Sequence, residues 1–317
     1  MPTKVFIDGE VGTTGLQIKA RLDSRRDLEF IRLSEANRKD AGARAEALNS
    51  ADIVILCLPD DAAKEAVALI ENPAVRVIDA STAHPTAPGW AYGLPEMSAS
   101  QRQVISGAKR VTNPGCYPTG AISLIRPLVE GGILPADTPV TINAVSGYSG
   151  GGKGMIAEFE DETSPNYTHV PYRIYAMGLE HKHVEEIRVY GELKHRPLFA
   201  PAVGRYAQGM IVEVPLQLWA LPGSATVARV YEAIADAYAD ERFVSVATLD
   251  EAAAMKTLDP EGLNGTNELK LFVFGNELRK QVRLVALLDN LGKGASAQAV
   301  QSMNIMLGLD EGLGVNL

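Results

Sequence analysis

The sequence has little of what marks a secreted or membrane protein. It contains two cysteines, Cys57 and Cys116, in 317 residues, which gives no disulfide framework. The opening residues MPTKVFIDG lack the basic and then apolar pattern of a secretory signal. No apolar run approaches the roughly 18 residues that a membrane helix needs. These features predict a cytoplasmic protein with reduced thiols and no membrane partner.

Positive charge is also in short supply. Lys and Arg number 30 against 39 Asp and Glu, a net charge of −9. This balance disfavours nucleic acid and anionic membranes as main partners. The chain shows no internal repeat and no low-complexity tract. Its 46% hydrophobic content is that of a globular protein, and its length fits two domains.

Strand and helix patterns alternate over the first 80 residues. Apolar runs typical of strands occupy 4–8, 28–33, 53–58 and 75–79, and helical patterns occupy 13–22 and 60–70. The unbroken apolar run IVILCL at 53–58 is typical of a parallel strand covered on both faces. This alternation predicts a doubly wound (Rossmann) α/β domain with a parallel sheet.

The character of the chain changes near Pro118. Strand patterns at 140–145, 210–218, 269–274 and 281–288 dominate, with an amphipathic helix at 226–239. They predict a second, α+β domain with a mostly antiparallel sheet. We expect residues 1–115 with 292–317 to form the dinucleotide-binding domain, to which a last helix near 295–307 returns. Residues 116–291 would form the catalytic and oligomerisation domain.

Three glycines follow the first predicted strand. They are spaced G-x-x-G-x-x-G, which departs from the usual G-x-G-x-x-G. Glycines there let the backbone approach a pyrophosphate at a helix N-terminus. A simple connecting turn is the alternative. The candidate cofactor-binding residues in this loop are Gly9, Val11, Gly12, Thr13, Thr14 and Gly15.

The segment after the second predicted strand bears on cofactor choice. An NAD site usually places an acidic residue there, bonded to the ribose 2′-hydroxyl. Here Ser34, Arg38 and Lys39 could hold a 2′-phosphate, which favours NADP, while Glu35 keeps NAD open. Arg38 and Lys39 could also belong to a solvated loop.

Cys116 lies in Asn113-Pro-Gly-Cys-Tyr-Pro-Thr119. Pro118 suits the first turn of a helix, so the thiol should lie near a helix N-terminus, where positive potential favours the thiolate. We therefore expect Cys116 to be a covalent nucleophile. Cys57, inside an apolar strand, fits a buried small hydrophobic side chain better.

Two of the five histidines are candidates for acid–base catalysis. His181 and His183 flank Lys182 in EHKHVEE, and spacing does not say which is the base. Glu180, Glu185 or Glu186 could orient an imidazole. Two surface histidines are the plain alternative, and a metal site is not expected because no third and fourth ligand is evident. A cysteine, a histidine and a nicotinamide together suggest that an acyl group forms a thioester, which hydride then reduces to an aldehyde.

Several ordered motifs resemble the N-acetyl-γ-glutamyl-phosphate reductases, particularly their shorter form. They are GEVGTTG, DASTAH, YGLPE, NPGCYPT, SGYSGGGK, EHKHVEEI and the C-terminal DNLGKGASAQAVQSMN. The resemblance implies NADPH-dependent reduction of N-acetylglutamyl 5-phosphate to its semialdehyde, with phosphate release, in arginine biosynthesis. It also implies that Cys116 is the nucleophile and that His181 or His183 is the acid/base.

The same resemblance assigns further positions. Gly9 to Gly15 would hold the pyrophosphate, Ser81 and Thr82 would lie near the cofactor, and Asn290 with Lys293 and Gly294 would close over it. Such enzymes are generally homo-oligomers, so a dimer or tetramer is expected. They share a two-domain plan with aspartate-semialdehyde dehydrogenases.

The phosphate site departs from the family pattern. Relatives often carry an arginine after the D-x-S-x-x segment, where this chain has Pro85. Possible replacements are Arg110, Lys153, Arg173 and Lys182. Candidate substrate-binding residues are Asn113, Ser146, Gly147, Arg110 and Lys182. SGYSGGGK could form a backbone loop shaped around the substrate, with Ser146, Ser149 or nearby amides as donors, and a flexible glycine loop is the alternative. YGLPE fits a structural turn.

Two other functions remain open from the residues. One is reduction of another acyl phosphate, such as aspartyl phosphate or an aminoadipyl derivative, by an enzyme like aspartate-semialdehyde dehydrogenase. The other is a non-catalytic regulator that binds NADP. Retention of both Cys116 and the histidine pair argues against the regulator.

Overall fold

A computed structural model describes residues 2–223 and 225–315. Contacts divide the described chain into two compact units. The first contains the chain up to Pro95, Ser100–Pro114 and Ala295–Val315. The second contains Glu96–Ala99 and Gly115–Gly294. No helix in these described ranges is long and apolar enough to cross a membrane.

The first unit is built on a six-stranded sheet with the order β2-β1-β3-β4-β6-β5. Every neighbouring pair is parallel, which confirms the predicted doubly wound sheet. The strands are β1 (Thr3–Asp8), β2 (Leu28–Ile31), β3 (Ile53–Leu56), β4 (Arg76–Asp79), β5 (Ala91–Tyr92) and β6 (Arg110–Thr112).

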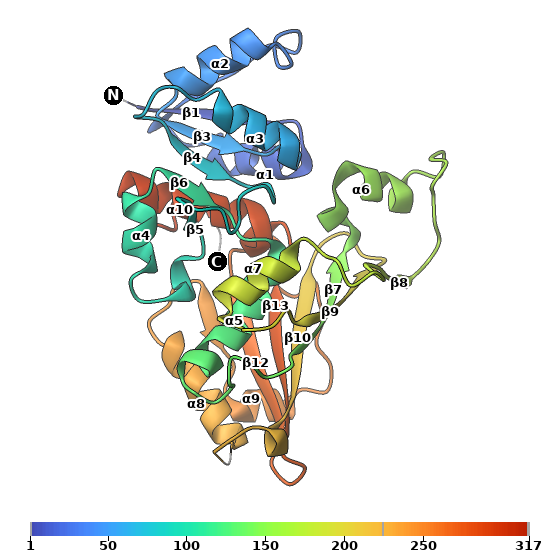
Figure 1. The fold of residues 1–317 in the computed structure, drawn as a ribbon. Helices are drawn as coiled ribbons and strands as arrows, with labels where there is room; N and C mark the ends of the chain where they lie inside the picture. Colours follow the sequence, from blue (N-terminus) through green and yellow to red (C-terminus); the bar gives the residue numbers. More distant parts are fainter. Residues whose placement is uncertain (1, 224, 316–317) are drawn as a thin grey trace. The chain divides into compact units, whose positions relative to one another are not determined.

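Five helices complete this unit (Figure 1). They are α1 (Thr13–Leu22), α2 (Ala41–Ser50), α3 (Asp60–Ala68), α4 (Gln101–Gly107) and α10 (Ala297–Leu307). Alternate residues of β1 enter two separate cores: Val5 and Ile7 join one with α1 and α10, and Phe6 joins another with α2 and α3. Burial on both faces explains the unbroken apolar runs of these strands. The parallel strands end together at the edge where the glycine loop follows β1.

The second unit carries a seven-stranded sheet with the order β11-β12-β13-β10-β7-β9-β8. Four of its six pairs are antiparallel, while β7–β9 and β11–β12 are parallel. The prediction of a mostly antiparallel sheet is confirmed. The strands are β7 (Thr141–Gly147), β8 (Tyr172–Ile174), β9 (Leu198–Gly204), β10 (Met210–Gln217), β11 (Val244–Val246), β12 (Leu269–Asn276) and β13 (Gln281–Leu288).

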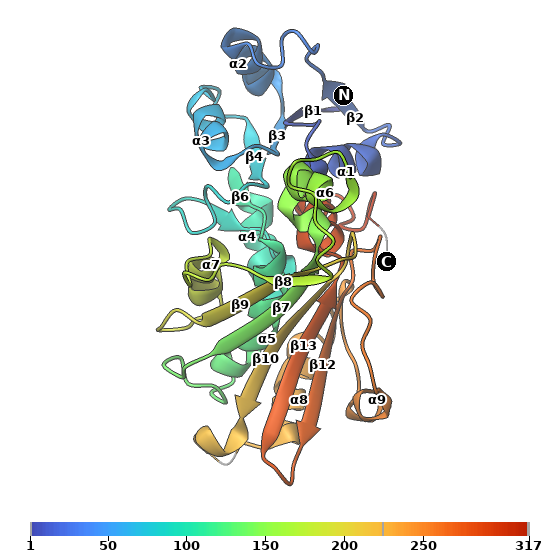
Figure 2. The same ribbon diagram turned by 90° about the vertical axis from the view of Figure 1, so that its right-hand side faces the viewer.

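Helices α5 (Cys116–Glu130) and α8 (Val227–Ala237) cover one face of this sheet, and they lie behind β10, β12 and β13 in Figure 2. Met210, Val212 and Val214 of β10 face this core, whereas Ile211 and Glu213 alternate to the opposite face. The sequence predicted α8 but not α6 (Gly152–Glu160), α7 (His183–Tyr190) or α9 (Leu249–Ala254). These three helices are short, so their apolar periodicity is weak.

Candidate active site and cofactor site

The glycine loop after β1 has a backbone that larger residues would not tolerate. Gly9 has a φ of +91°, and a Cβ on Gly15 would lie 2.3 Å from the carbonyl oxygen of Gly9. The Gly12 amide donates to the Gly9 carbonyl at 2.9 Å, which closes the turn directly before α1. A dinucleotide pyrophosphate fits such a turn, because the main-chain N–H groups of the protein at a helix N-terminus can donate to phosphate oxygens.

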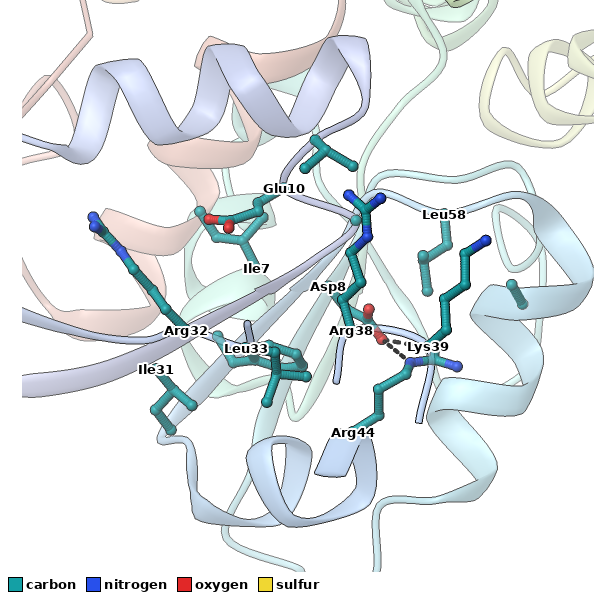
Figure 3. A pocket seen from close by; sticks show the side chains of 14 residues that line it. Ile7, Asp8, Glu10, Ile31, Arg32, Leu33, Arg38, Lys39, Arg44 and Leu58 are labelled. Atoms are coloured by element: carbon teal, nitrogen blue, oxygen red, sulfur yellow. Dashed lines mark hydrogen bonds and ion pairs between the residues drawn. The ribbon is translucent and has the colours of Figure 1, made fainter. Parts of the chain in front are cut away.

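A cavity of about 490 Å³ opens beside this loop (Figure 3). It is lined by Gly9, Glu10 and Val11 and by basic residues that follow β2. Arg44 donates to the buried Asp8 at 2.8 Å, and Arg38 and Lys39 lie beside this pair.

Charge in this cavity is mostly positive. Arg38 pairs with Glu35 at 3.1 Å, but the Glu35 side chain is 88% exposed, so this ion pair is screened by solvent. Lys39 forms no ion pair within residues 2–223 and 225–315. A phosphate group is the natural complement of such a cluster.

Apart from Asn290, the predicted cofactor residues line the cavity, form the turn beside it, or lie outside its lining. Gly9, Val11 and Arg38 line the cavity, and the stretch Gly12–Gly15 forms the adjoining turn and the start of α1. Ser34 does not line it, although the Ser34 carbonyl accepts from the amides of the following turn. Ser81 and Thr82 follow β4 and also lie outside the lining, where the Thr82 hydroxyl donates to Asp60 at 2.8 Å.

A second cavity, of about 250 Å³, lies in the second unit. It brings together six of the predicted catalytic and substrate residues: Cys116, Ser146, Gly147, His181, Lys182 and His183. Six other lining residues were not predicted from the sequence: Tyr117, Gly150, Gly151, Met155, Tyr175 and Val203. The two glycines, Gly150 and Gly151, belong to SGYSGGGK, the loop for which a place around the substrate was one of the two interpretations.

Cys116 is the first residue of α5, with Gly115 as its N-cap. The Gly115 amide donates to the Glu186 carboxylate at 2.9 Å, which ties this turn to α7. A Cβ on Gly294 would lie 2.7 Å from the Cβ of Cys116, so only glycine fits against the nucleophile there.

The electrostatics of Cys116 differ from the sequence expectation. Burial raises the pKa of the Cys116 thiol to about 12, and this effect outweighs the backbone N–H groups at the helix start and the charge of Lys182, which lower it. The prediction that the helix N-terminus would favour the thiolate named a real contribution but not the dominant one. A nearby base must therefore take the proton.

Both candidate histidines are neutral near neutral pH. His183 is 6% exposed, and burial lowers its pKa well below the usual value. Burial and the charge of Lys182 lower the pKa of His181 to about 4. A hydrogen bond joins the two residues, since the His183 amide donates to Nδ1 of His181 at 3.2 Å.

His183 lies closest to the turn that carries the nucleophile. A Cβ on Gly115 would lie 2.5 Å from Nε2 of His183, so the ring packs directly on the Gly115 backbone. Its Nδ1 has no hydrogen-bond partner within the described ranges. His181 packs instead among aromatic rings, including those of Tyr117 and Tyr175.

The three neighbouring glutamates have other partners. Glu180 pairs with Arg196 at 2.8 Å, and Glu185 pairs with Arg188 at 2.6 Å. Glu186 accepts from the Gly115 amide. Glu180 and Glu185 are therefore engaged by arginines rather than by an imidazole.

The remaining predicted residues lie elsewhere. Asn113 and Arg110 belong to the first unit; the Asn113 side chain donates to the Ala295 carbonyl at 3.0 Å, and Arg110 begins β6, at the strand end opposite the glycine loop. Asn290 belongs to the second unit, where it donates to Ser149 at 3.1 Å and accepts from the Gly209 amide. The structure thus gives Asn290 a role in shaping the SGYSGGGK loop.

Lys293 pairs with Glu96 of YGLPE at 2.7 Å, and both side chains are fully buried. This buried ion pair gives Glu96 of YGLPE a structural role, as expected for a structural turn. Within residues 2–223 and 225–315, no group of three or more His, Cys, Asp or Glu could hold a metal ion.

Comparisons with known proteins agree with this arrangement. Residues 26–105 match the family model described as the NAD binding domain of semialdehyde dehydrogenase, and residues 116–290 match the one described as its dimerisation domain. The chain is also similar to solved structures named aspartate-semialdehyde dehydrogenase. One from Vibrio cholerae gives a TM-score of 0.70 at 14% identity, and a probable one from Pseudomonas aeruginosa gives 0.71 at 15%; each covers 97% of this chain and 99% of its own. At such identities the likeness shows the fold.

Relatives in sequence are much closer. The chain is 56% identical over 306 residues to the N-acetyl-γ-glutamyl-phosphate reductase of Burkholderia cenocepacia, covering 96% of this chain and 97% of the relative. It is 55% identical over 309 residues to that of Brucella ovis, covering 97% of this chain and all of the relative. The chain therefore belongs to the N-acetyl-γ-glutamyl-phosphate reductase family, on the fold of the semialdehyde dehydrogenases.

Proposed function

We propose that this chain catalyses the NADPH-dependent reduction of N-acetyl-L-glutamyl 5-phosphate to N-acetyl-L-glutamate 5-semialdehyde, with release of phosphate, in arginine biosynthesis. The observation that carries the proposal is one cavity lined by Cys116, His181 and His183, in a chain 55–56% identical to reductases named for this substrate. The reverse reaction, followed through NADPH formation, tests it.

The residues of this cavity support a covalent route. A neutral imidazole accepts the proton of the Cys116 thiol, and the sulfur then bonds to the acyl carbon. The bond from that carbon to the phosphate oxygen breaks, phosphate leaves and takes up a proton from solvent, and a thioester remains on Cys116. NADPH, when bound, would supply the hydride that reduces the thioester carbon. The carbon–sulfur bond then breaks, the aldehyde leaves, and the imidazolium returns its proton to the thiolate.

We assign the acid/base role to His183. Its ring lies on Gly115, directly before the nucleophile, and its Nδ1 is buried without a protein partner in the described chain. His181 would then hold His183 in place through the bond between the His183 amide and Nδ1 of His181. The reaction requires a free thiol, which fits a reducing compartment such as the cytoplasm, and it requires no metal ion.

The basic cavity beside the glycine loop supports NADP as the cofactor. Gly9–Gly15 would receive the pyrophosphate, and Arg38 with Lys39 would bind the 2′-phosphate. Glu35, the residue that kept NAD open, is exposed to solvent and paired with Arg38.

Cofactor preference can be measured directly. Arg38→Ala and Lys39→Ala should each lower kcat/KM for NADPH about 10- to 100-fold, because each removes a charge-assisted hydrogen bond. NADH has no 2′-phosphate, so its kcat/KM serves as the internal control and should change by less than about three-fold. Equal losses with both cofactors would show that these residues do not bind the 2′-phosphate.

The second sheet supports a homo-oligomer. On the face opposite α5 and α8, a groove of about 330 Å³ is lined by Ile211, Phe274 and Val285, with the ion pair Glu213–Arg283 across it. This face lies within the region matched to a dimerisation domain. We place a second copy of the chain here, as a dimer or as the dimer unit of a tetramer.

Charge reversal on this face should weaken the assembly. Arg283→Glu would set like charges against Glu213 in both copies and should raise the dissociation constant about 30-fold or more, an effect of about 2 kcal/mol. Sedimentation velocity across a dilution series measures this shift. Lys194→Glu, at an exposed loop residue that does not line the groove, is the matched control. An unchanged oligomer in Arg283→Glu would move the interface elsewhere.

A further inference from the structure

We infer that Lys182 binds the phosphoryl group of the acyl-phosphate substrate and, in the reverse direction, inorganic phosphate. This inference rests on the proposed function and names the phosphate ligand of the same site. It bears on a position where the sequence departs from the family pattern, since Pro85 stands where an arginine was expected.

Lys182 is distinguished by the composition of the catalytic cavity. Of the described residues lining it, Lys182 alone carries a permanent charge. The others are Cys116, neutral histidines, tyrosines, Ser146 and small or apolar residues. A doubly charged leaving group in such a cavity needs a cation, and Lys182 is the side chain placed to supply it.

The charge of Lys182 is not neutralised within the protein. Lys182 is exposed and forms no ion pair or hydrogen bond through its side chain in the part of the chain that the structure describes. The acidic neighbours in its own segment are engaged: Glu180 with Arg196, Glu185 with Arg188, and Glu186 with the Gly115 amide. The ammonium group therefore remains available to an anionic ligand.

The field of Lys182 reaches the reacting groups. It lowers the pKa of both His181 and His183, and it opposes the rise in the pKa of the Cys116 thiol. A phosphoryl group held by this ammonium would therefore lie within electrostatic reach of the sulfur, as the leaving group of an attack by Cys116 must.

The other candidate phosphate ligands are either paired already or do not line the cavity. Arg173 pairs with Glu158 at 2.7 Å and stacks over Phe159, so its guanidinium is already used. Lys153 lies on α6 and does not line the cavity. Arg110 belongs to β6 of the first unit and does not line the cavity either.

The first test needs no turnover. We would compare the rates at which iodoacetate and iodoacetamide alkylate Cys116, by peptide mass spectrometry, with and without inorganic phosphate. A cation near the thiol favours the anionic reagent. In the unmodified protein, bound phosphate should slow alkylation of Cys116. Lys182→Met should lower the ratio of the iodoacetate rate to the iodoacetamide rate about five-fold, which corresponds to about 1 kcal/mol, and should abolish this protection by phosphate.

Two further variants sharpen this experiment. Lys182→Arg keeps the charge and should retain both the ratio and the protection, and Lys153→Met should behave as the unmodified protein. An unchanged ratio in Lys182→Met, with protection retained, would overturn the inference. Because alkylation does not depend on the substrate, this result stands whether or not the proposed reaction is correct.

The second test separates phosphate from the substrate carboxylate. In the reverse reaction, Lys182→Met should raise the KM for phosphate about ten-fold or more while the KM for the semialdehyde changes little. A rise confined to the semialdehyde KM would assign Lys182 to the carboxylate and would contradict the inference. Absence of turnover in the unmodified protein, with intact charge selectivity of alkylation, would instead count against the proposed function alone.

Discussion

Cys116→Ser should lower kcat by about 1,000-fold or more, with little change in folding. A serine hydroxyl is a far weaker nucleophile than a thiolate, and removal of a covalent nucleophile from other enzymes costs losses of this size or larger. Serine is close in volume to cysteine, so the contact with Gly294 is retained. Steady-state rates in the reverse direction, with thermal unfolding measured in parallel, check both parts of this expectation.

The other cysteine supplies the control. Cys57 follows β3 and packs with the apolar core of the first unit, so Cys57→Ala should keep kcat within a few-fold. Loss of activity in Cys57→Ala together with full activity in Cys116→Ser would remove the covalent route. Detection of an acyl group covalently attached to the unmodified protein, but not to Cys116→Ser, would directly support the thioester.

Lys293→Met should destabilise the protein by about 3–5 kcal/mol. Lys293 and Glu96 are both fully buried and lie 2.7 Å apart, with the ammonium group also over the ring of Phe243 at 5.7 Å. Removing one partner leaves the other as a buried charge without its counter-ion, and that cost exceeds the value of the pair itself. Denaturant unfolding of the whole chain measures the change.

A second variant distinguishes a lost contact from an uncompensated charge. Glu96→Gln combined with Lys293→Met should recover a large part of the loss, because neither charge remains. Lys64→Met removes an exposed partner of Asp61 and should cost less than about 1 kcal/mol. The family resemblance placed Lys293 in a segment that closes over the cofactor. A rise in the NADPH KM without loss of stability would support that role and contradict ours.

Much of the fold follows from local patterns. The unbroken apolar run at 53–58 predicted a parallel strand covered on both faces, and β3 is buried along its whole length in a parallel sheet. Strand patterns at 210–218 and 281–288 predicted two strands of the second sheet, and these segments form β10 and β13. Helices α6 and α7 were not predicted, since α6 begins in a glycine-rich run and α7, with eight residues, is too short to show a clear apolar period.

The site was predictable only where its residues sit in distinctive local sequence. Cys116 stood out because proline and glycine surround it, and the histidines stood out because they are paired. Tyr175 was missed because one tyrosine after a short strand has no local signature, although its hydroxyl donates to that of Tyr117 at 3.0 Å beside the nucleophile.

The buried ion pair could not be predicted, because it joins residues that are far apart in the sequence. The partners Glu96 and Lys293 are separated by nearly 200 positions, so no window of sequence joins them. The pKa of Cys116 was misjudged for a related reason. Its helix position is local and visible in the sequence, whereas its burial depends on the distant Gly294 and on the packing of the whole second unit.

The central claim is a phosphate-dependent, cysteine-mediated reaction on N-acetylglutamate semialdehyde. The most direct measurement is NADPH formation from N-acetylglutamate semialdehyde, inorganic phosphate and NADP⁺, followed by absorbance, with Cys116→Ser alongside. We predict NADPH formation that requires phosphate and is lost in the variant. Activity with aspartate semialdehyde but not with the acetylated substrate would contradict the substrate assignment. Tight NADPH binding without turnover of either aldehyde would contradict the account as a whole.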